Sequence, residues 1–391
     1  MRFPEFTDEW KEVPFASNLE RLENGVNYNT NDKDGVPMSR IETISTGRID
    51  YTKVGYCSTP QKIEHYIMRY GDILFSHINS LKHIGKTAYY SAEKPLYHGM
   101  NLLLFRCKNN IDSKFFFFLI NNTHFIRKCQ ILAKQAVNQA SISTSDLKKI
   151  KVYIPNINEQ SKIQKFLSLI EKRIEVQNKI IEKYESLIQA IIYKAKMDGI
   201  SKGTWRKIDL YEVLQERNEK NVEGRTICSV SVSQGVVNQI EYLGRSFAAK
   251  QTSHYNVVKY GDIVYTKSPT GDFPYGIIKR SDIREDVAVS PLYGVYIPAN
   301  DSMGVILHFY FMQPYNAFNY LHPLIQKGAK NTINISNGRF LENSVPLPVS
   351  ESEANAIAVM LKSIQAKIEI EKKLLQSYAK EKEYLLHQMF I

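Results

Sequence analysis

Two short segments of the chain that lie 190 residues apart are closely similar, and this repeat limits the possible folds more than any other feature. The first segment is Tyr70-Gly-Asp-Ile-Leu-Phe-Ser76, and the second is Tyr260-Gly-Asp-Ile-Val-Tyr-Thr266. Trp10 is matched in the same way by Trp205, at an offset of 195. Because several matches occur in the same order, we expect the 391 residues to contain two copies of one structural unit.

Each copy begins with a mixed segment and ends with a long segment that lacks proline. Short β-like runs separated by Gly, Asn and Pro turns occupy the mixed part. One helical stretch is predicted in each, Lys114–Ala133 in the first copy and Val305–Gln326 in the second. The proline-free segments Asn158–Lys196 and Glu351–Phe390 follow, and Asn158 is the expected N-cap of the first.

Both proline-free segments carry a heptad pattern, over Ile163–Ala195 and Ile357–Met389. Such an apolar seam is buried most directly when two helices pack on each other. Gln177 and Glu371 interrupt the seams at equivalent positions, where a polar contact would set the register. We expect an antiparallel pair. A parallel pair would also bring Gln177 and Glu371 together, and another alternative is that each helix covers only its own domain. The expected seam residues are Leu167, Ile174, Gln177, Ile181, Leu361, Ile368, Glu371 and Leu375.

These patterns predict an α+β protein with two similar mixed α/β domains, separated by a two-helix antiparallel coiled coil in a pseudo-twofold repeat. The expected boundaries are residues 1–155 and 200–348 for the globular domains, 156–199 for the central helix and 349–391 for the C-terminal helix. The four cysteines are scattered without a CxxC pair, and the N-terminus is charged. We therefore expect a cytoplasmic protein without a disulfide framework or a structural zinc site.

The basic excess of the chain lies mainly in the two globular segments. Lys and Arg number 51 against 40 Asp and Glu, for a formal net charge of +11. Residues 1–155 carry a net charge of +6, and residues 200–348 carry +3. This distribution favours a polyanionic partner of the globular domains, although charge alone does not identify nucleic acid.

Two pairs of polar loops contain the kinds of side chain that bind DNA. Ser76–Lys86 and Thr266–Asp272 follow equivalent strands but differ in sequence, and Lys134–Ser143 and Lys327–Ser336 precede the last strand of each domain. Amides, hydroxyls and cations bond base edges and phosphates; the alternative is that these are ordinary solvated loops. The candidate DNA-binding residues are His77, Asn79, Lys82, His83, Lys86, Asn138, Gln139, Lys267, Ser268, Thr270, Lys330 and Asn331.

No catalytic motif is complete in the sequence. Ser80–Thr87 is similar to a phosphate-binding loop, but Ser80 replaces the first glycine and a β-like run follows in place of a helix. HExxH, GxSxG and glycine-rich dinucleotide motifs are missing, and the sequence has no Pro-Pro pair for an Asn-Pro-Pro-Tyr methyltransferase motif. We therefore expect neither a catalytic centre nor a metal site.

The repeated motifs, taken together, match the pattern of one known family. They comprise the strands around Tyr70 and Tyr260, the domain-closing stretches Ile142–Pro155 and Ile335–Pro348, and the helices that follow. The second helix departs from the pattern, because it starts Glu-Ser-Glu-Ala-Asn where the first has Glu-Gln. Over its whole length the chain resembles the specificity subunit of type I restriction–modification systems.

The resemblance implies that each globular domain is a target-recognition domain for one half of a bipartite DNA sequence. The coiled coil would set the spacing between the halves and dock two modification (methyltransferase) subunits, with restriction subunits bound through them. The chain itself would be non-catalytic and would bind no cofactor, because S-adenosylmethionine, ATP and Mg²⁺ would belong to its partners; no membrane would be involved. The alternatives are a coiled-coil scaffold or adaptor that binds proteins rather than DNA, and an enzyme with an unrecognised site.

Overall fold

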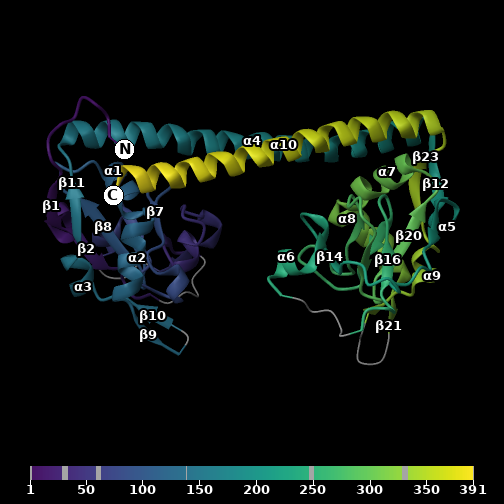
Figure 1. The fold of residues 1–391 in the computed structure, drawn as a ribbon, viewed down its shortest axis with the longest axis horizontal. Helices are drawn as coiled ribbons and strands as arrows, with labels where there is room; N and C mark the ends of the chain where they lie inside the picture. Colours follow the sequence, from purple (N-terminus) through teal and green to yellow (C-terminus); the bar gives the residue numbers. More distant parts are fainter. Residues whose placement is uncertain are drawn as a thin grey trace. The chain divides into compact units, whose positions relative to one another are not determined.

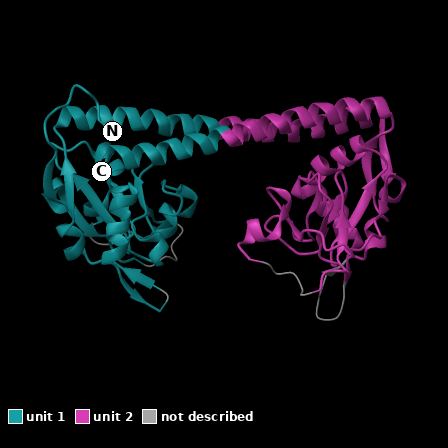
Figure 2. Ribbon diagram, viewed as in Figure 1, with its two compact units in different colours: residues 1–177, 374–391 teal, residues 178–373 magenta. Residues whose placement is uncertain are grey.

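The computed structural model of the protein describes residues 2–28, 34–58, 63–137, 139–245, 251–327 and 333–390. The chain forms two compact units (Figure 2): unit 1 comprises residues 1–177 and 374–391, and unit 2 comprises residues 178–373. The long helices α4 (Ile157–Lys202) and α10 (Glu351–Met389) each contribute to both units (Figure 1). Each unit therefore contains a globular part and one part of each long helix.

Unit 1 is built around a four-stranded antiparallel sheet with the strand order β2–β8–β5–β7. Phe75 of β5 and Phe105 of β8 are fully buried, and the phenylalanine-rich helix α1 packs into the same core. The core also takes in the start of α4 and the end of α10, because Leu167 and Phe390 belong to it. The bounds are β2 (Leu19–Asn24), β5 (Ile73–Phe75), β7 (Thr87–Tyr89), β8 (Leu103–Cys107), α1 (Ser113–Ile120) and α2 (Thr123–Leu132).

Unit 2 is built around a sheet of the same topology, with the strand order β13–β20–β17–β18. Tyr265 of β17 and Tyr296 of β20 are fully buried, and each stacks on Phe340 with ring centroids 4.7 Å apart. The bounds are β13 (Leu214–Glu216), β17 (Ile263–Tyr265), β18 (Ile278–Arg280), β20 (Gly294–Pro298), α7 (Asp301–Phe311) and α8 (Pro314–Leu321).

Smaller elements complete both units. The first and last strands of each globular part pair with each other, β1 with β11 in unit 1 and β12 with β23 in unit 2. The bounds are β1 (Lys11–Pro14), β3 (Val36–Met38), β4 (Gly55–Cys57), α3 (Thr144–Lys149), β11 (Lys151–Ile154), β12 (Trp205–Asp209), α5 (Leu210–Val213), β14 (Cys228–Ser231), β15 (Gly235–Asn238), α6 (Gln239–Leu243), β16 (Asn256–Val258), β19 (Val287–Val289), α9 (Asn337–Phe340) and β23 (Ser344–Pro348).

The repeated Tyr-Gly-Asp motif forms the turn that leads into the central strand of each sheet. Gly71 and Gly261 have φ angles of +91° and +90°, which a residue with a side chain rarely adopts. The Asp72 carboxylate accepts a hydrogen bond from the Arg69 backbone N–H at 2.7 Å, and Asp262 accepts the equivalent bond from Lys259 at 2.8 Å. The most obvious repeat in the sequence is therefore a structural turn.

The repeated tryptophan ties the first strand of each globular part to the long helix that closes it. Trp10 donates from Nε1 to Glu159 Oε1 at 3.2 Å, and Trp205 donates from Nε1 to Glu353 Oε1 at 2.8 Å. The prediction that Asn158 is the N-cap of the first helix is wrong. The Asn156 side chain accepts the hydrogen bond from the Glu159 backbone N–H at 3.0 Å, so the helix begins two residues earlier than expected.

Each of the two shorter helical stretches was expected to be one helix and is two. In unit 1 the Asn122 side chain accepts from the Phe125 N–H at 2.7 Å and starts α2 as a new helix after α1. In unit 2 Pro314 occupies the first turn of α8, where its missing N–H does no harm, and α7 ends before it. A capping asparagine and a proline are therefore the physical causes of the two breaks.

The long helices run antiparallel within each unit, as predicted. In unit 1 Glu171 and Lys382 form an ion pair at 2.8 Å, and Arg173 lies over the Tyr378 ring at 6.0 Å. Residue numbers therefore increase along α4 in the direction in which they decrease along α10. Leu167, Ile181, Leu361 and Ile368 are all at most 7% exposed, Gln177 is buried, and Ile174, Glu371 and Leu375 are half-buried. Among the described residues no helix combines the length and apolar character needed to cross a membrane.

Candidate nucleic-acid interface

The two polar loops predicted in unit 1 come together in one small antiparallel sheet. β9 (Lys134–Ala136) and β10 (Gln139–Ser141) form a hairpin, and β6 (Ile78–Asn79) pairs with the other edge of β10. The hairpin lies at the end of unit 1 that is farthest from the long helices (Figure 1). Sequence reasoning selected both loops separately but contained no signal that they pair.

His77 and Lys86 take structural roles at the base of this sheet. The His77 side chain is 7% exposed, and burial lowers the pKa of its imidazole to about 4, so the ring is neutral at physiological pH. Its backbone carbonyl accepts a hydrogen bond from the Ile142 N–H at 3.0 Å. Lys86 is half-buried and donates from Nζ to the Ser45 carbonyl at 2.8 Å. Neither side chain projects from the surface as a free DNA-binding group.

The other predicted residues of unit 1 differ in how far local bonds engage them. Asn79 donates to Ser76 Oγ at 3.2 Å and accepts from the Ser80 N–H at 2.8 Å, so its amide is already paired. His83 Nδ1 lies 3.1 Å from Ser80 Oγ and the residue is half-buried. Lys82 and Gln139 are exposed and remain the most accessible candidates. Asn138 lies outside the described residues.

In unit 2 the loop after β17 forms its own turn. Thr270 and Phe273 exchange backbone hydrogen bonds of 3.1 and 2.9 Å, and Ser268 and Thr270 are exposed. Lys267 is half-buried, and burial lowers the pKa of its ammonium group, with Glu216 acting in the opposite direction. The hairpin of unit 2 pairs β21 (Gln326–Lys327) with β22 (Ile333–Asn334). The predicted residues Lys330 and Asn331 lie outside the described residues.

A feature that sequence reasoning missed is the lack of acidic residues in the two sequence segments that contain the hairpins. No Asp or Glu occurs between Asp112 and Asp146 in unit 1 or between Asp301 and Glu342 in unit 2, although the chain has 40 acidic residues among 391. Both stretches run through the paired helices of the unit and the hairpin that follows. Because carboxylates repel phosphates, segments without them are suited to bind a polyanion where they are exposed. A count of Asp and Glu along the sequence would have revealed both stretches.

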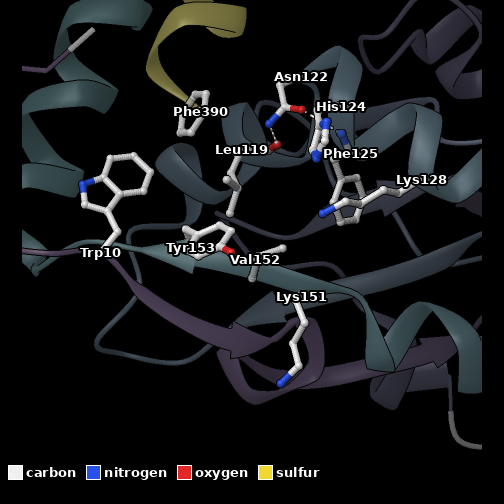
Figure 3. A pocket seen from close by; sticks show the side chains of 10 residues that line it. All are labelled: Trp10, Leu119, Asn122, His124, Phe125, Lys128, Lys151, Val152, Tyr153 and Phe390. Atoms are coloured by element: carbon white, nitrogen blue, oxygen red, sulfur yellow. Dashed lines mark hydrogen bonds between the residues drawn. The ribbon is translucent and has the colours of Figure 1, made fainter.

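The cavity shown in Figure 3 does not resemble a substrate site. It lies in unit 1, has a volume of about 50 Å³ and is lined mainly by apolar side chains, among them Trp10, Phe125 and Phe390. Ligand pockets usually measure roughly 300–1,000 Å³. Its polar Asn122 side chain is occupied by the hydrogen bonds that end α1 and cap α2, to the Leu119 carbonyl and from the Phe125 N–H.

The described residues also contain no group of three or more His, Cys, Asp or Glu side chains that would hold a metal ion. The segment that resembles a phosphate-binding loop leads into strand β7, not a helix. Its Lys86 is bonded to a backbone carbonyl. The exposed polar and cationic side chains of the hairpin and loops therefore remain the candidate interface.

Comparisons with known proteins agree with this geometry. Residues 18–186 match the family described as "Type I restriction modification DNA specificity domain". The putative type I restriction enzyme MjaX specificity subunit of Methanocaldococcus jannaschii is 32% identical over 410 aligned positions, which cover 98% of this chain and 93% of that protein. This identity over nearly the whole of both chains shows a family relationship.

A solved structure extends the comparison to the fold. The S subunit of a type I restriction–modification system from M. genitalium superposes with a TM-score of 0.57 at 14% identity, covering 100% of this chain and 99% of that one. The alignment with the HsdS subunit from Thermoanaerobacter tengcongensis covers 100% of this chain and 98% of that one at 15% identity, with a TM-score of 0.37. Members of this family are the non-catalytic DNA-recognition subunits of their complexes. The chain belongs to the family of type I restriction–modification specificity subunits.

Proposed function

We propose that the target-recognition domains, residues 1–155 and 200–348, each bind double-stranded DNA and read one half of a bipartite sequence. One observation carries this proposal: the two central sheets have the same strand order, whereas the loops after β5 and β17 differ in both sequence and structure. A common frame with divergent surface loops is what the recognition of two different half-sites requires. The net charges of +6 and +3 supply the sequence-independent attraction to phosphates.

The long helices would set the distance between the two halves of the target. α4 has 46 residues and α10 has 39, and each helix contributes to both compact units. A helix rises about 1.5 Å per residue, so inserting or deleting turns changes a length by defined steps. In this proposal the number of unspecified base pairs follows from these two helices.

The same helices would also dock the partner subunits. A groove of about 480 Å³ in unit 1 is lined by Phe166, Leu169, Val176 and Tyr378 together with charged residues. Leu169 is 63% exposed and Val176 is 47% exposed. Apolar side chains gathered on an exposed surface are typical of a protein interface. We assign this groove to one of two modification subunits, with restriction subunits bound through them in the cytoplasm, and assign S-adenosylmethionine, ATP and Mg²⁺ to those partners.

The test of DNA reading is a selection experiment on the full chain with a pool of randomised duplexes. We expect the recovered sequences to contain two conserved blocks separated by a fixed number of variable base pairs. Mobility shifts at low and high salt should show weaker binding as the salt rises. A chain that retains no duplex at low salt would be a scaffold or adaptor for proteins, and the proposal would be wrong.

The Ile181→Lys variant tests whether the long helices set the distance between the two halves of the target. Ile181 is 7% exposed, so a charge there should disrupt the seam. We expect methylome sequencing of cells that express the chain with its modification subunit to show loss of methylation at the bipartite target. Unchanged methylation with an unchanged spacer would remove the seam from the proposal.

A further inference from the structure

The β9–β10 hairpin of unit 1 has two chemically different faces. Residues directly opposite each other in an antiparallel pair lie on the same face of the sheet. Gln135 is itself exposed, but it is paired with Ala140, which is 2% exposed and belongs to the core of unit 1, so the face that these two residues share is the one turned toward the unit. Lys134 is paired with Ser141, so these two residues lie on the opposite face, which points to solvent.

The outward face carries polar groups of the kind that read DNA bases. Gln139 lies on it, opposite Ala136, and Lys134, Gln139 and Ser141 are all exposed. Within the described part of the chain none of these three side chains forms a hydrogen bond or an ion pair. They differ in this respect from Asn79 and Lys86, whose polar groups are engaged by their own unit.

The shape and charge of the hairpin favour the major groove of DNA as its binding partner. The major groove of B-DNA, roughly 12 Å wide, admits a two-stranded β-ribbon, and its base edges present the acceptors and donors that a glutamine amide can pair with bidentately at adenine. The hairpin lies in the stretch between Asp112 and Asp146 that has no acidic residue. Val137, which follows β9, is 99% exposed and offers an apolar contact of the kind that thymine methyl groups accept.

We propose that the β9–β10 hairpin enters the major groove and that Gln139 reads an adenine in the half-target bound by unit 1, with Lys134 and Ser141 contacting neighbouring base edges or phosphates. This inference rests on the proposed function, because it names the groups by which unit 1 reads its half of the target. It makes Gln139 a specificity-determining residue and assigns Gln135, on the other face of the same hairpin, no part in reading.

The experiment compares the full-length chain with its Gln139→Ala and Gln135→Ala variants. Each protein is first incubated with the randomised duplex pool, and the recovered sequences are compared. Gln139→Ala should lose the preference at one A·T pair in one block, leave the other block unchanged, and weaken binding to the wild-type target roughly 5- to 150-fold. Gln135→Ala removes the same amide from the same hairpin and should leave both sequence and affinity unchanged.

A base analogue identifies the groove. 7-Deazaadenine at that pair removes N7, an acceptor in the major groove, without altering the minor-groove edge. The wild-type chain should lose affinity for this duplex, whereas the Gln139→Ala variant should bind the modified and unmodified duplexes equally. Equal binding of both duplexes by the wild-type chain would overturn the assignment to the major groove.

The remaining outcomes separate this inference from the function on which it rests. If the wild-type chain enriches two blocks and Gln139→Ala enriches the same two with equal affinity, the hairpin assignment is wrong and the proposed function stands. If the wild-type chain enriches no sequence, the proposed function fails. A Gln135→Ala variant that behaves like Gln139→Ala would show that the hairpin acts through its stability, which also overturns the inference.

Discussion

Asp72 in unit 1 and Asp262 in unit 2 occupy the same turn, yet the arginines that pair with them come from different parts of the two globular folds. Arg106, on β8, bonds both Asp72 oxygens, at 2.8 and 2.7 Å. Arg217, directly after β13, bonds both Asp262 oxygens, at 2.6 and 2.9 Å. Both carboxylates are at most 2% exposed, and a buried charge is costly unless it is paired. The comparison teaches that both turns contain a buried aspartate paired with an arginine, whereas the position that supplies the arginine differs between the units.

The loops after the two central strands diverge further. In unit 1 this loop adds β6 to the hairpin, with Asn79 opposite Ala140. In unit 2 the corresponding loop closes on itself between Thr270 and Phe273. Surface loops can satisfy their polar groups with water or with ligands, so nothing in the frame forces them to be alike. Different loops on sheets of the same strand order are the physical basis of the proposed bipartite recognition.

The largest expected effect tests whether the two turns are equivalent. We expect Asp72→Ala to lower the free energy of unfolding of its unit by about 3–5 kcal/mol, because it leaves the partly buried Arg106 unpaired. Asp262→Ala should lower that of unit 2 by less, because Arg217 keeps an ion pair with Glu219 at 3.4 Å. Chemical denaturation of the full chain measures this loss. Glu42→Ala is the control, since Glu42 is 64% exposed and its pair with Arg40 spans 3.8 Å. A loss in only one unit would show that the shared motif has different roles.

The pH dependence of stability should also differ between the units. Burial lowers the pKa of His77 and His98 in unit 1 to about 4 each, and burial together with Lys279 and Arg280 lowers that of His308 in unit 2 to about 3. The unfolded chain protonates these histidines near pH 6.5, whereas the folded chain does not. Stability is therefore greatest above pH 6.5 and falls as the pH drops, by about 1.4 kcal/mol per pH unit for each histidine.

Unit 1, with two such histidines, should lose stability more steeply between pH 6.5 and 5 than unit 2 does. Unfolding titrations at several pH values, with a probe in each unit, measure the two slopes. His98→Gln should reduce the slope of unit 1 only. Equal slopes in the wild-type chain, or a slope that this variant leaves unchanged, would contradict the assignment.

A smaller effect is expected where the repeated tryptophans meet the long helices. Trp205→Phe should cost about 1.5–3 kcal/mol, because it removes a hydrogen bond to the Glu353 carboxylate. Trp10→Phe should cost less, since Arg2 bonds both oxygens of Glu159 at 2.7 Å and keeps that carboxylate paired. Thermal unfolding of the two variants compares these losses. A greater loss for Trp10→Phe would mean that Arg2 does not compensate in unit 1.

The smallest expected effect concerns one exposed cation of the predicted loop. Lys82→Gln should weaken binding to all duplexes by a similar factor and reduce the slope of log affinity against log salt by about 1. Lys165→Gln on α4 makes the same charge change on the long helix and should leave the slope unchanged. Mobility shifts over a series of salt concentrations measure both. An unchanged slope for Lys82→Gln would remove this residue from the interface.

Much of the frame could be predicted from the sequence because its determinants are local or periodic. The heptad seam predicted two long helices, because apolar residues at heptad spacing mark the buried face of a helix. The repeat predicted two similar domains, because similar sequences in the same order form similar units. The positions of α1 and α2 were predicted only as one stretch, because the break depends on a single capping residue, Asn122. The candidate loops could be proposed from the sequence, since polar groups after a strand are visible there, and their DNA binding stays a prediction.

What the tertiary structure decided is which polar groups are engaged within the protein and which remain available. His77, Lys86 and Gln139 look alike in the sequence as polar residues of loops, but the first is buried, the second is bonded to Ser45, and the third is exposed on a hairpin. The arginine partner of each buried aspartate was equally hidden from sequence reasoning. These outcomes depend on contacts between residues far apart in the chain, and only the packed fold sets them. The sequence by itself determined the two similar sheets and the two long helices, because the periodicity of buried residues and the turn residues can be recognised locally in it.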